Sequence, residues 1–204
     1  FKRPPSKLHL YLSSRLGSMH RRRGTRLNVL APRGSAKSTL VTLAYVLRAA
    51  LFGTERYIWI LSDTKPQAIA HLENIRLELE ENLLLRAEFP AEVVPPSPWR
   101  ANRLVLGNGA AIEAFGTGQR IRGKRRRDER PTLIVCDDLQ NDGHILSASR
   151  RQRGRTWFHG SLLKAGTPTT NVINLATALH REALALELCR TPGWESRIFK
   201  SIVR

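Results

Sequence analysis

One short segment of the chain combines a lysine, several hydroxyl side chains and a glycine in an order suited to binding phosphate. It reads Ala31-Pro32-Arg33-Gly34-Ser35-Ala36-Lys37-Ser38-Thr39 and lies between the largely apolar residues 27–30 and 40–47. A strand, a tight loop and a helix start gather backbone N–H groups that have no intrahelical partner, and such groups bind anions. In this type of loop the lysine reaches the β- and γ-phosphates of a nucleotide, and the next hydroxyl binds Mg²⁺. The segment therefore predicts a nucleotide and Mg²⁺ site, with Lys37 and Ser38 in these two roles.

The same segment departs from the usual P-loop pattern, G-x-x-x-x-G-K-[ST], at both glycines. Ala31 and Ala36 stand at the glycine positions. A non-catalytic DNA-binding protein with a degenerate P-loop is therefore one alternative. Arg33 lies four residues before Lys37, where a guanidinium can reach the γ-phosphate and stabilise charge in the transition state. The alternative is that Arg33 only neutralises phosphate or binds a carboxylate of the loop.

Two carboxylates follow another apolar run. Residues 133–136 read Leu-Ile-Val-Cys, and Asp137 and Asp138 come next. Ligands gather at the carboxyl ends of parallel strands, so both side chains should lie beside the phosphate loop. This is the Walker B arrangement of a P-loop ATPase, in which we assign Asp137 to Mg²⁺ and Asp138 to the attacking water. The alternative is that the pair forms a turn or a helix cap.

A third polar residue follows an apolar run in the same way. Residues 172–176 predict a strand, and Thr177 comes directly after it. If this strand lies beside the one that ends in Asp137, the Thr177 hydroxyl could sense the γ-phosphate and report hydrolysis to the rest of the domain. The alternative is a cap at the strand end.

Strands and helices alternate along the chain. The helix that follows residue 64 has one apolar face, and its members are Ile69, Leu72, Ile75, Leu79 and Leu83. Asn108-Gly109 is a strong hairpin signal between the apolar residues 104–106 and 111–115. The remaining apolar runs predict strands at 27–30, 57–61, 132–136, 172–176 and 196–203, and helices at 37–52, at 147–164 and from 180.

Strands that are apolar throughout are typical of a parallel sheet with helices on both faces. We therefore expect an α/β fold with a mainly parallel central sheet flanked by helices and a β-hairpin insertion. We expect a single domain, in which residues 1–25 form a basic lead-in with a short helix and residues 26–204 form the P-loop core.

The charge of the chain is strongly positive, with 34 Lys and Arg against 17 Asp and Glu and a net charge of +17. A folded domain this basic favours nucleic acid as its partner. The cations concentrate at residues 119–127 and 150–155, and either cluster could contact DNA. The alternative is that residues 119–127 form a solvated basic loop and residues 150–155 a solvated helix face. The candidate DNA-binding residues are Arg120, Lys124, Arg126, Arg127, Arg150 and Arg151.

Other features argue against several classes of protein. The two cysteines, Cys136 and Cys189, form no disulfide framework and have no metal-ligand neighbours. No apolar run approaches the ~18 residues of a membrane span, and no signal peptide is recognisable. We therefore expect a protein of a reducing cytosol that does not enter a membrane.

Taken together, these motifs resemble the ATPase domain of the large terminase subunit of tailed phages. Besides the P-loop, they are Leu61-Ser62-Asp63-Thr64 with its helix, Ile121-Arg122-Gly123, Asp137-Asp138-Leu139-Gln140-Asn141-Asp142 and Ala176-Thr177-Ala178-Leu179-His180. The resemblance implies an ASCE-type P-loop NTPase that hydrolyses ATP with Mg²⁺ to move double-stranded DNA into a procapsid. It implies catalytic roles for Arg33, Lys37, Asp138 and Thr177, with Arg122 or Arg125 offered to a neighbouring subunit.

The resemblance also implies partners. These are a portal protein, a small terminase subunit and further copies of the chain in a ring, generally of five, in the cytoplasm of the host cell. Two departures stand out: residues 1–24 hold no clear glutamine for the family's adenine-recognition motif, and no acidic triad of a nuclease domain follows Val203. We therefore expect no DNA cleavage. A helicase-like nucleic-acid ATPase is the other enzymatic alternative.

Overall fold

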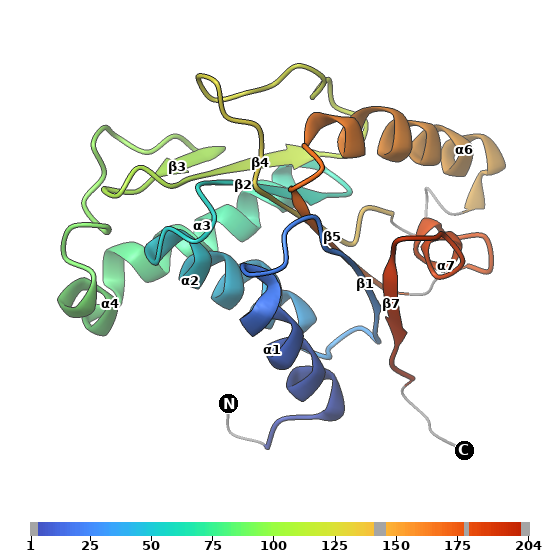
Figure 1. The fold of residues 1–204 in the computed structure, drawn as a ribbon, viewed down its shortest axis with the longest axis horizontal. Coiled ribbons are helices and arrows are strands. Elements are labelled where there is room, and N and C mark those ends of the chain that lie inside the picture. Colours follow the sequence, from blue (N-terminus) through green and yellow to red (C-terminus); the bar gives the residue numbers. More distant parts are fainter. Residues whose placement is uncertain (1–3, 141–145, 178–179, 201–204) are drawn as a thin grey trace.

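A seven-stranded sheet forms the centre of the molecule (Figure 1). The computed structural model describes residues 4–140, 146–177 and 180–200. The strand order is β3-β4-β2-β5-β6-β1-β7, and every pairing is parallel except that of β3 with β4. The strands are β1 Arg26–Leu30, β2 Tyr57–Ser62, β3 Arg103–Val105, β4 Ala111–Gly116, β5 Leu133–Asp137, β6 Asn171–Ala176 and β7 Glu195–Ile198. The predicted α/β class and mainly parallel sheet are therefore confirmed.

Helices cover both faces of this sheet. The lead-in folds as α1, Lys7–Met19, and the P-loop leads into a π-helical segment, Thr39–Tyr45, that continues as α2, Val46–Leu51. The other helices are α3 Lys65–Glu81, α4 Leu83–Glu88, α6 Ala148–Trp157 and α7 Leu184–Leu188. A π-helical turn, Phe158–Leu162, and a 3₁₀ turn, Leu163–Ala165, extend α6.

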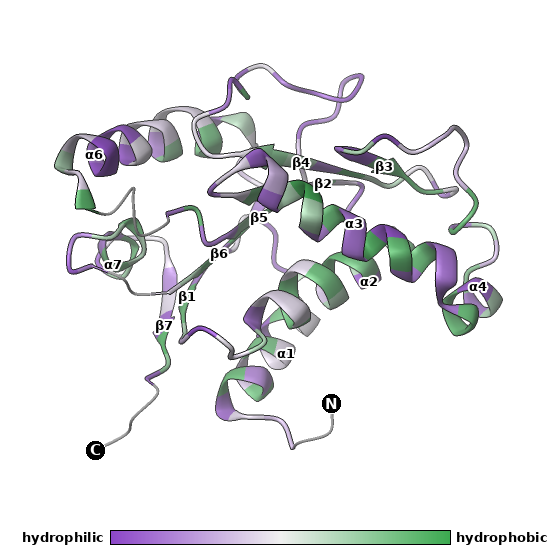
Figure 2. Ribbon diagram, turned by 180° about the vertical axis from the view of Figure 1, so that it is seen from behind, coloured by the Kyte–Doolittle hydropathy of each residue, from purple (hydrophilic) through white to green (hydrophobic). Residues whose placement is uncertain are grey.

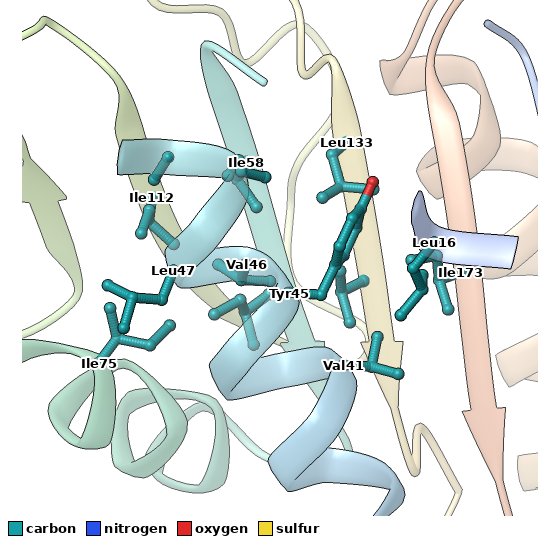
Figure 3. Close-up of a cluster of buried hydrophobic side chains, with 14 of the residues drawn as sticks. Leu16, Val41, Tyr45, Val46, Leu47, Ile58, Ile75, Ile112, Leu133 and Ile173 are labelled. Carbon is teal, nitrogen blue, oxygen red and sulfur yellow. The ribbon is translucent and has the colours of Figure 1, made fainter. Parts of the chain in front are cut away.

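Alternate residues of the strands point into two separate cores. Ile58 and Ile60 of β2 pack with α1, α2 and α3 on one face, whereas Trp59 packs with the α6 extension and α7 on the other. Figure 3 shows the first core, where Tyr45, Val46 and Leu47 meet strand residues. The hydropathy pattern agrees, because α2 is largely apolar and α6 strongly polar (Figure 2). The sheet is thus buried on both sides, as its continuous apolar strands predicted.

Local capping explains where several helices begin and end. Thr64 caps α3 by accepting a hydrogen bond from the Gln67 N–H. Asn82 caps α4 by accepting from Leu84 and Leu85, so one helix ends and another begins at this residue. For this reason the predicted apolar face that included Leu83 is wrong at that residue, which is 75% exposed.

Three other predictions need correction or stay open. The helix predicted from His180 begins at Leu184, while residues 178–179 lie outside the described part of the chain. The last strand ends at Ile198, and residues 201–203 are not described. The predicted hairpin is present, but its second strand β4 pairs with β2 and so belongs to the main sheet.

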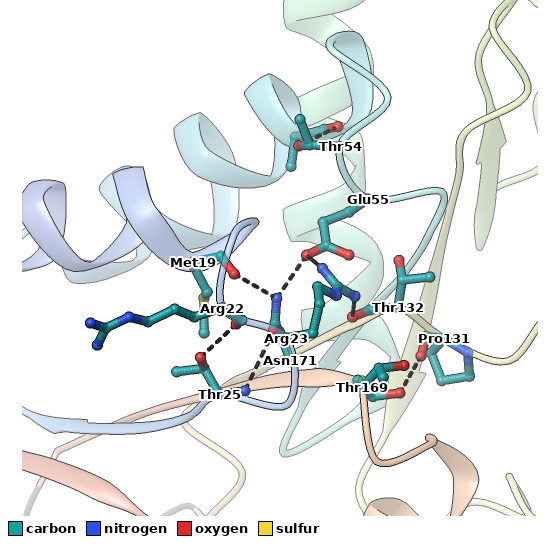
Figure 4. A network of polar contacts seen from close by, with 12 residues as sticks. Met19, Arg22, Arg23, Thr25, Thr54, Glu55, Pro131, Thr132, Thr169 and Asn171 are labelled. Carbon is teal, nitrogen blue, oxygen red and sulfur yellow. Dashed lines mark hydrogen bonds and ion pairs between the residues drawn. The ribbon is translucent and has the colours of Figure 1, made fainter.

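A buried polar network ties the lead-in to the edge of the sheet opposite the P-loop (Figure 4). Arg23 Nη1 lies 2.6 Å from Glu55 Oε1, and Asn171 donates a 3.0 Å hydrogen bond to the same oxygen. Glu55 is fully buried, so these partners offset the cost of desolvating its charge. Leu8, Leu12 and Leu16 of α1 are also buried, which makes the lead-in an integral part of the fold.

Candidate active site

The P-loop keeps its turn although two glycines are missing. Gly34 has φ 74° and Ala36 has φ 56°, so Ala36 adopts the left-handed conformation that glycine usually supplies. An alanine pays roughly 1–2 kcal/mol for this conformation. Ala31 has no such demand, because its N–H donates to Ala176 O at 3.0 Å and continues the β1–β6 pairing. The alanines therefore do not prevent the loop from forming.

Three side chains surround the Asp137 carboxylate at the end of β5. Ser38 Oγ donates to Asp137 Oδ1 at 3.0 Å, and Thr42 Oγ1 donates to Asp137 Oδ2 at 2.6 Å. His71 Nε2 of α3 lies 3.6 Å from the same Oδ2. The structure thus brings Ser38 and Asp137 together as the sequence predicted, and it adds Thr42 and His71.

Sequence reasoning missed both additions. Thr42 lies four residues after Ser38 and so on the same helical face, which is a signal that could have identified it. His71 gave no such signal, because its approach to Asp137 depends on how α3 packs against the helix that follows the P-loop.

The second carboxylate contacts the P-loop lysine. Lys37 Nζ lies 3.3 Å from Asp138 Oδ2 and donates a 3.1 Å hydrogen bond to Thr177 Oγ1. The Thr177 N–H donates to Asp138 Oδ1 at 2.9 Å, and Asp138 has φ 49°. Because β6 lies between β1 and β5, its end brings Thr177 between the lysine and the carboxylate. The three residues therefore meet at one edge of the sheet.

The predicted arginines lie in different surroundings. Arg33 is exposed on the P-loop. Arg122 donates twice to the Gly160 carbonyl, from Nε at 3.2 Å and from Nη2 at 2.8 Å, and so caps the extension of α6. Arg125 is exposed and makes no hydrogen bond or ion pair with another described residue. Of the two candidates for a contact with a neighbouring subunit, Arg125 is therefore the more available.

A pocket of about 800 Å³ opens beside the P-loop, between α1 and the residues after β7. His9 Nε2 donates to Ser35 O at 3.0 Å, and Tyr11 and Phe199 pack with ring centroids 5.6 Å apart. The pocket lining includes Pro32, Gly34, Ser35, His9, Tyr11 and Phe199. Ser35 Oγ is buried and has no hydrogen-bond partner among the described residues, so this polar atom remains available to a ligand.

Two shifted pKa values describe the surroundings of the site. Burial, followed by the hydrogen bond to Glu195, raises the pKa of Tyr11 to about 12, so its hydroxyl stays a neutral donor. Burial, with the charge of Asp137 adding to it, raises the pKa of the Cys136 thiol above its ordinary value. Cys136 is therefore a neutral side chain of the core.

The residues fit a magnesium ion bound together with phosphate. Mg²⁺ in such sites takes one or two protein ligands and completes its shell with phosphate oxygens and water. Ser38 and Asp137 lie within hydrogen-bond distance of each other and supply such a pair of oxygens. Among the described residues, no three His, Cys, Asp or Glu side chains gather into a metal-binding group. Within the same part of the chain, no helix is long and apolar enough to cross a membrane.

We expect Thr42→Val to weaken Mg²⁺ binding. Valine has a similar shape but cannot donate to Asp137, and losing a group that orients a metal ligand costs about 10–100-fold in affinity. It should also lower the free energy of unfolding by about 1–3 kcal/mol, because Thr42 is buried. Mg²⁺ titrations of nucleotide binding and denaturant unfolding measure the two effects. Thr42→Ser keeps the donor and should restore both, and equal behaviour of the two variants would contradict the role.

Comparisons with solved structures identify similar folds. The ATPase domain of the large terminase of Thermus phage P74-26 matches with TM-score 0.58 and 15% identity over 95% of this chain and 85% of that one. A point mutant of that domain matches with TM-score 0.59 and 15% identity over 97% and 86%. The large terminase of a thermophilic bacteriophage matches with TM-score 0.55 and 13% identity over 97% of this chain and 46% of its own length.

Searches at the level of sequence gave no match, either to a family model or to a curated protein. The structural likeness extends over nearly the whole chain. The chain therefore has an α/β fold like that of terminase ATPase domains, as the sequence motifs predicted.

Proposed function

We propose that this chain is the ATPase domain of a phage DNA-packaging motor, which hydrolyses ATP to move double-stranded DNA into a procapsid. The observation that carries the proposal is the meeting of Lys37, Asp138 and Thr177 beside the Ser38–Asp137 pair, at the carboxyl edge of a parallel sheet. Residues from three segments that lie 39 to 140 positions apart in the chain gather where a P-loop ATPase needs them. The fold that holds them resembles that of terminase ATPase domains.

Each residue of this group has a role in the proposed reaction. The N–H groups of residues 33–38 would hold the phosphates, and Lys37 would neutralise the β- and γ-phosphates. Mg²⁺, held by Ser38 and Asp137, would offset charge that develops on the phosphate oxygens. Arg33 is exposed on the loop, from which it could reach the γ-phosphate.

Asp138 would orient the attacking water. The water oxygen bonds to the γ-phosphorus, the bond from that phosphorus to the β–γ bridging oxygen breaks, and the carboxylate accepts a proton from the water. The Thr177 N–H already holds Asp138 Oδ1, so it would keep the carboxylate aimed during this step. Thr177 also contacts Lys37, which supports its role in sensing the γ-phosphate.

The pocket beside the P-loop would receive the nucleoside part of ATP. It adjoins Pro32, Gly34 and Ser35, and its far wall carries the aromatic rings of Tyr11 and Phe199. Aromatic side chains of this kind stack on bases without needing a glutamine. His9 already donates to Ser35 O, so α1 would couple the position of the base to the loop.

Packaging further requires partners. We propose that the chain assembles with copies of itself as a ring, generally of five, on a portal protein and acts with a small terminase subunit in the host cell cytoplasm. In such a ring Arg125 would be the arginine offered to the nucleotide of a neighbour. Its exposure and its lack of a partner among the described residues support this choice over Arg122.

A triplex-displacement assay tests the proposal. A third strand bound to a duplex should be removed in the presence of Mg²⁺ and ATP, while the two strands of the duplex stay paired. Separation of a forked duplex would identify a helicase-like ATPase instead. Absence of Mg·ATP binding in calorimetry would identify a degenerate P-loop, and either result would overturn the proposal.

A further inference from the structure

Helix α6 presents two sets of arginines with different surroundings. Arg151 Nη2 lies 2.5 Å from Glu182, and Arg155 Nε lies 2.8 Å from Glu187 Oε2. These pairs hold α6 against α7 and its preceding turn. The candidate DNA-binding residue Arg151 is therefore engaged inside the molecule, and its side chain is only 11% exposed.

The other two arginines of this helix face an open pocket. Arg150 and Arg153 are exposed, and neither makes an ion pair with another described residue. They line a pocket of about 270 Å³ together with Thr117, Gly118, Leu139, Gln140, Gly154 and Trp157. None of these described lining residues has an acidic side chain. Because residues three apart lie on one face of a helix, both guanidinium groups can approach the same ligand.

A third donor reaches the same pocket from the end of β5. Gln140 Oε1 accepts a 2.8 Å hydrogen bond from the Leu184 N–H, which leaves the side-chain NH₂ group of Gln140 as a donor. The side chains of Thr117 and Trp157 donate to backbone carbonyls, so two guanidinium groups and an amide NH₂ are the side-chain donors that the described lining offers to a ligand. Guanidinium groups bind phosphate through two parallel hydrogen bonds, so this chemistry suits a phosphate group.

The basic loop of residues 119–130 adjoins the pocket. Trp157 Nε1 donates to Gln119 O at 2.9 Å, and Arg122 binds Gly160 O, so the loop lies against α6 and its extension. Arg126 is also engaged, because it donates to Gly109 O at 2.6 Å. Arg120, Arg125 and Arg127 remain exposed and make no ion pair with another described residue. Figures 1 and 2 both place this loop and α6 at the same end of the molecule.

We propose that the pocket between Arg150 and Arg153 binds a phosphate of the duplex DNA backbone, with Arg120 and Arg127 of the loop contacting phosphates further along the duplex. This inference rests on the proposed function and names the surface that holds its substrate. DNA fits better than an acidic protein because the unpaired cations extend over two elements of a chain with net charge +17. The same assignment makes Arg126 and Arg151 structural residues.

The salt dependence of DNA binding tests the proposal. We expect Arg150→Gln with Arg153→Gln to reduce the slope of log affinity against log salt by about 0.9, the contribution of the one phosphate contact that the pocket provides. The affinity for a labelled duplex of random sequence, measured by fluorescence anisotropy, should fall at least 10-fold at low salt. Arg151→Gln with Arg155→Gln removes the same charge from the paired face; it should keep the parental slope but unfold at a lower temperature.

The possible outcomes distinguish the Arg150/Arg153 face from the Arg151/Arg155 face, and they distinguish failure of this inference from failure of the proposed function. Equal slopes for the parent and the Arg150/Arg153 variant would overturn the inference, as would equal losses in the two double variants. An equal loss of polyglutamate binding would assign the pocket to acidic polypeptides and overturn it too. If the parent itself shows no salt-dependent binding to duplex DNA, the proposed function fails rather than the choice of surface. Arg150→Lys with Arg153→Lys retains the charge and should keep most of the slope.

Discussion

Replacing Lys37 by alanine should lower kcat for ATP hydrolysis by about 10²–10³-fold, the loss found when one preorganised charge-stabilising donor is removed from an active site. The Lys37 side chain is 6% exposed, and its ammonium lies within 3.3 Å of both Thr177 and Asp138, so its position is fixed by the fold. Phosphate release gives kcat and KM, and calorimetry gives nucleotide affinity, which should also decrease because the ammonium binds phosphates directly.

We expect Lys37→Ala to stay folded, so the loss of ATP hydrolysis can be distinguished from unfolding by measuring the stability of the variant. Removing Lys37 leaves Asp138 without its cation, but the Asp138 side chain is 44% exposed and water can solvate it. Lys164→Ala removes the same charge from an exposed position and serves as the matched control. If Lys37→Ala hydrolyses ATP at the parental rate, the proposed mechanism is wrong.

The second large effect is expected for Asp138→Asn, which should lower kcat by about 10²–10⁴-fold, the contribution typical of a general base. The substitution disturbs the fold little. Asparagine keeps an oxygen that accepts from the Thr177 N–H, and it tolerates the φ of 49° better than most residues.

The same Asp138→Asn substitution should raise nucleotide affinity while it lowers kcat. Phosphates and the Asp138 carboxylate compete for the same Lys37 ammonium, so the neutral amide should allow tighter binding of Mg·ATP. Calorimetry measures the affinity, and single-turnover phosphate release measures the chemical step. Asp128→Asn, at an exposed position of the basic loop, is the control. Weaker binding with unchanged hydrolysis would contradict the assignment of Asp138.

Much of this site could be predicted because each part follows its own apolar strand. Parallel strands end at the same edge, so the sequence predicts Asp137 and Asp138 beside the loop that carries Lys37. Thr177 joins them only if its strand lies beside the one that ends in Asp137. The order itself, with β6 between β1 and β5, depends on long-range pairing and is established by the structure. The roles of these residues stay predictions until the variants are measured.

Side-chain partners were less accessible to sequence reasoning. The spacing of arginines along 119–130 gives no sign that Arg122 and Arg126 bind backbone carbonyls while Arg125 does not. Likewise, the partners of Arg151 and Arg155 lie about thirty residues away. Charge patterning identifies a basic surface. The carboxylates and carbonyls that bind some of its arginines are brought there by tertiary packing, which the pattern does not reveal.

The strand order also determines which parts of the molecule can fold early and which must fold late during synthesis. β1, which carries the P-loop, pairs with β6 and β7, whose residues follow it by about 145–170 positions. A ribosome adds about 5–20 residues per second, so the strand stays without its partners for roughly 10–30 s. Parallel pairings this distant in sequence close slowly because the loop entropy is lost before the contacts form. The proposed nucleotide site is therefore among the last features to assemble, and we expect nucleotide binding to appear on the nascent chain only after β7 has left the ribosome.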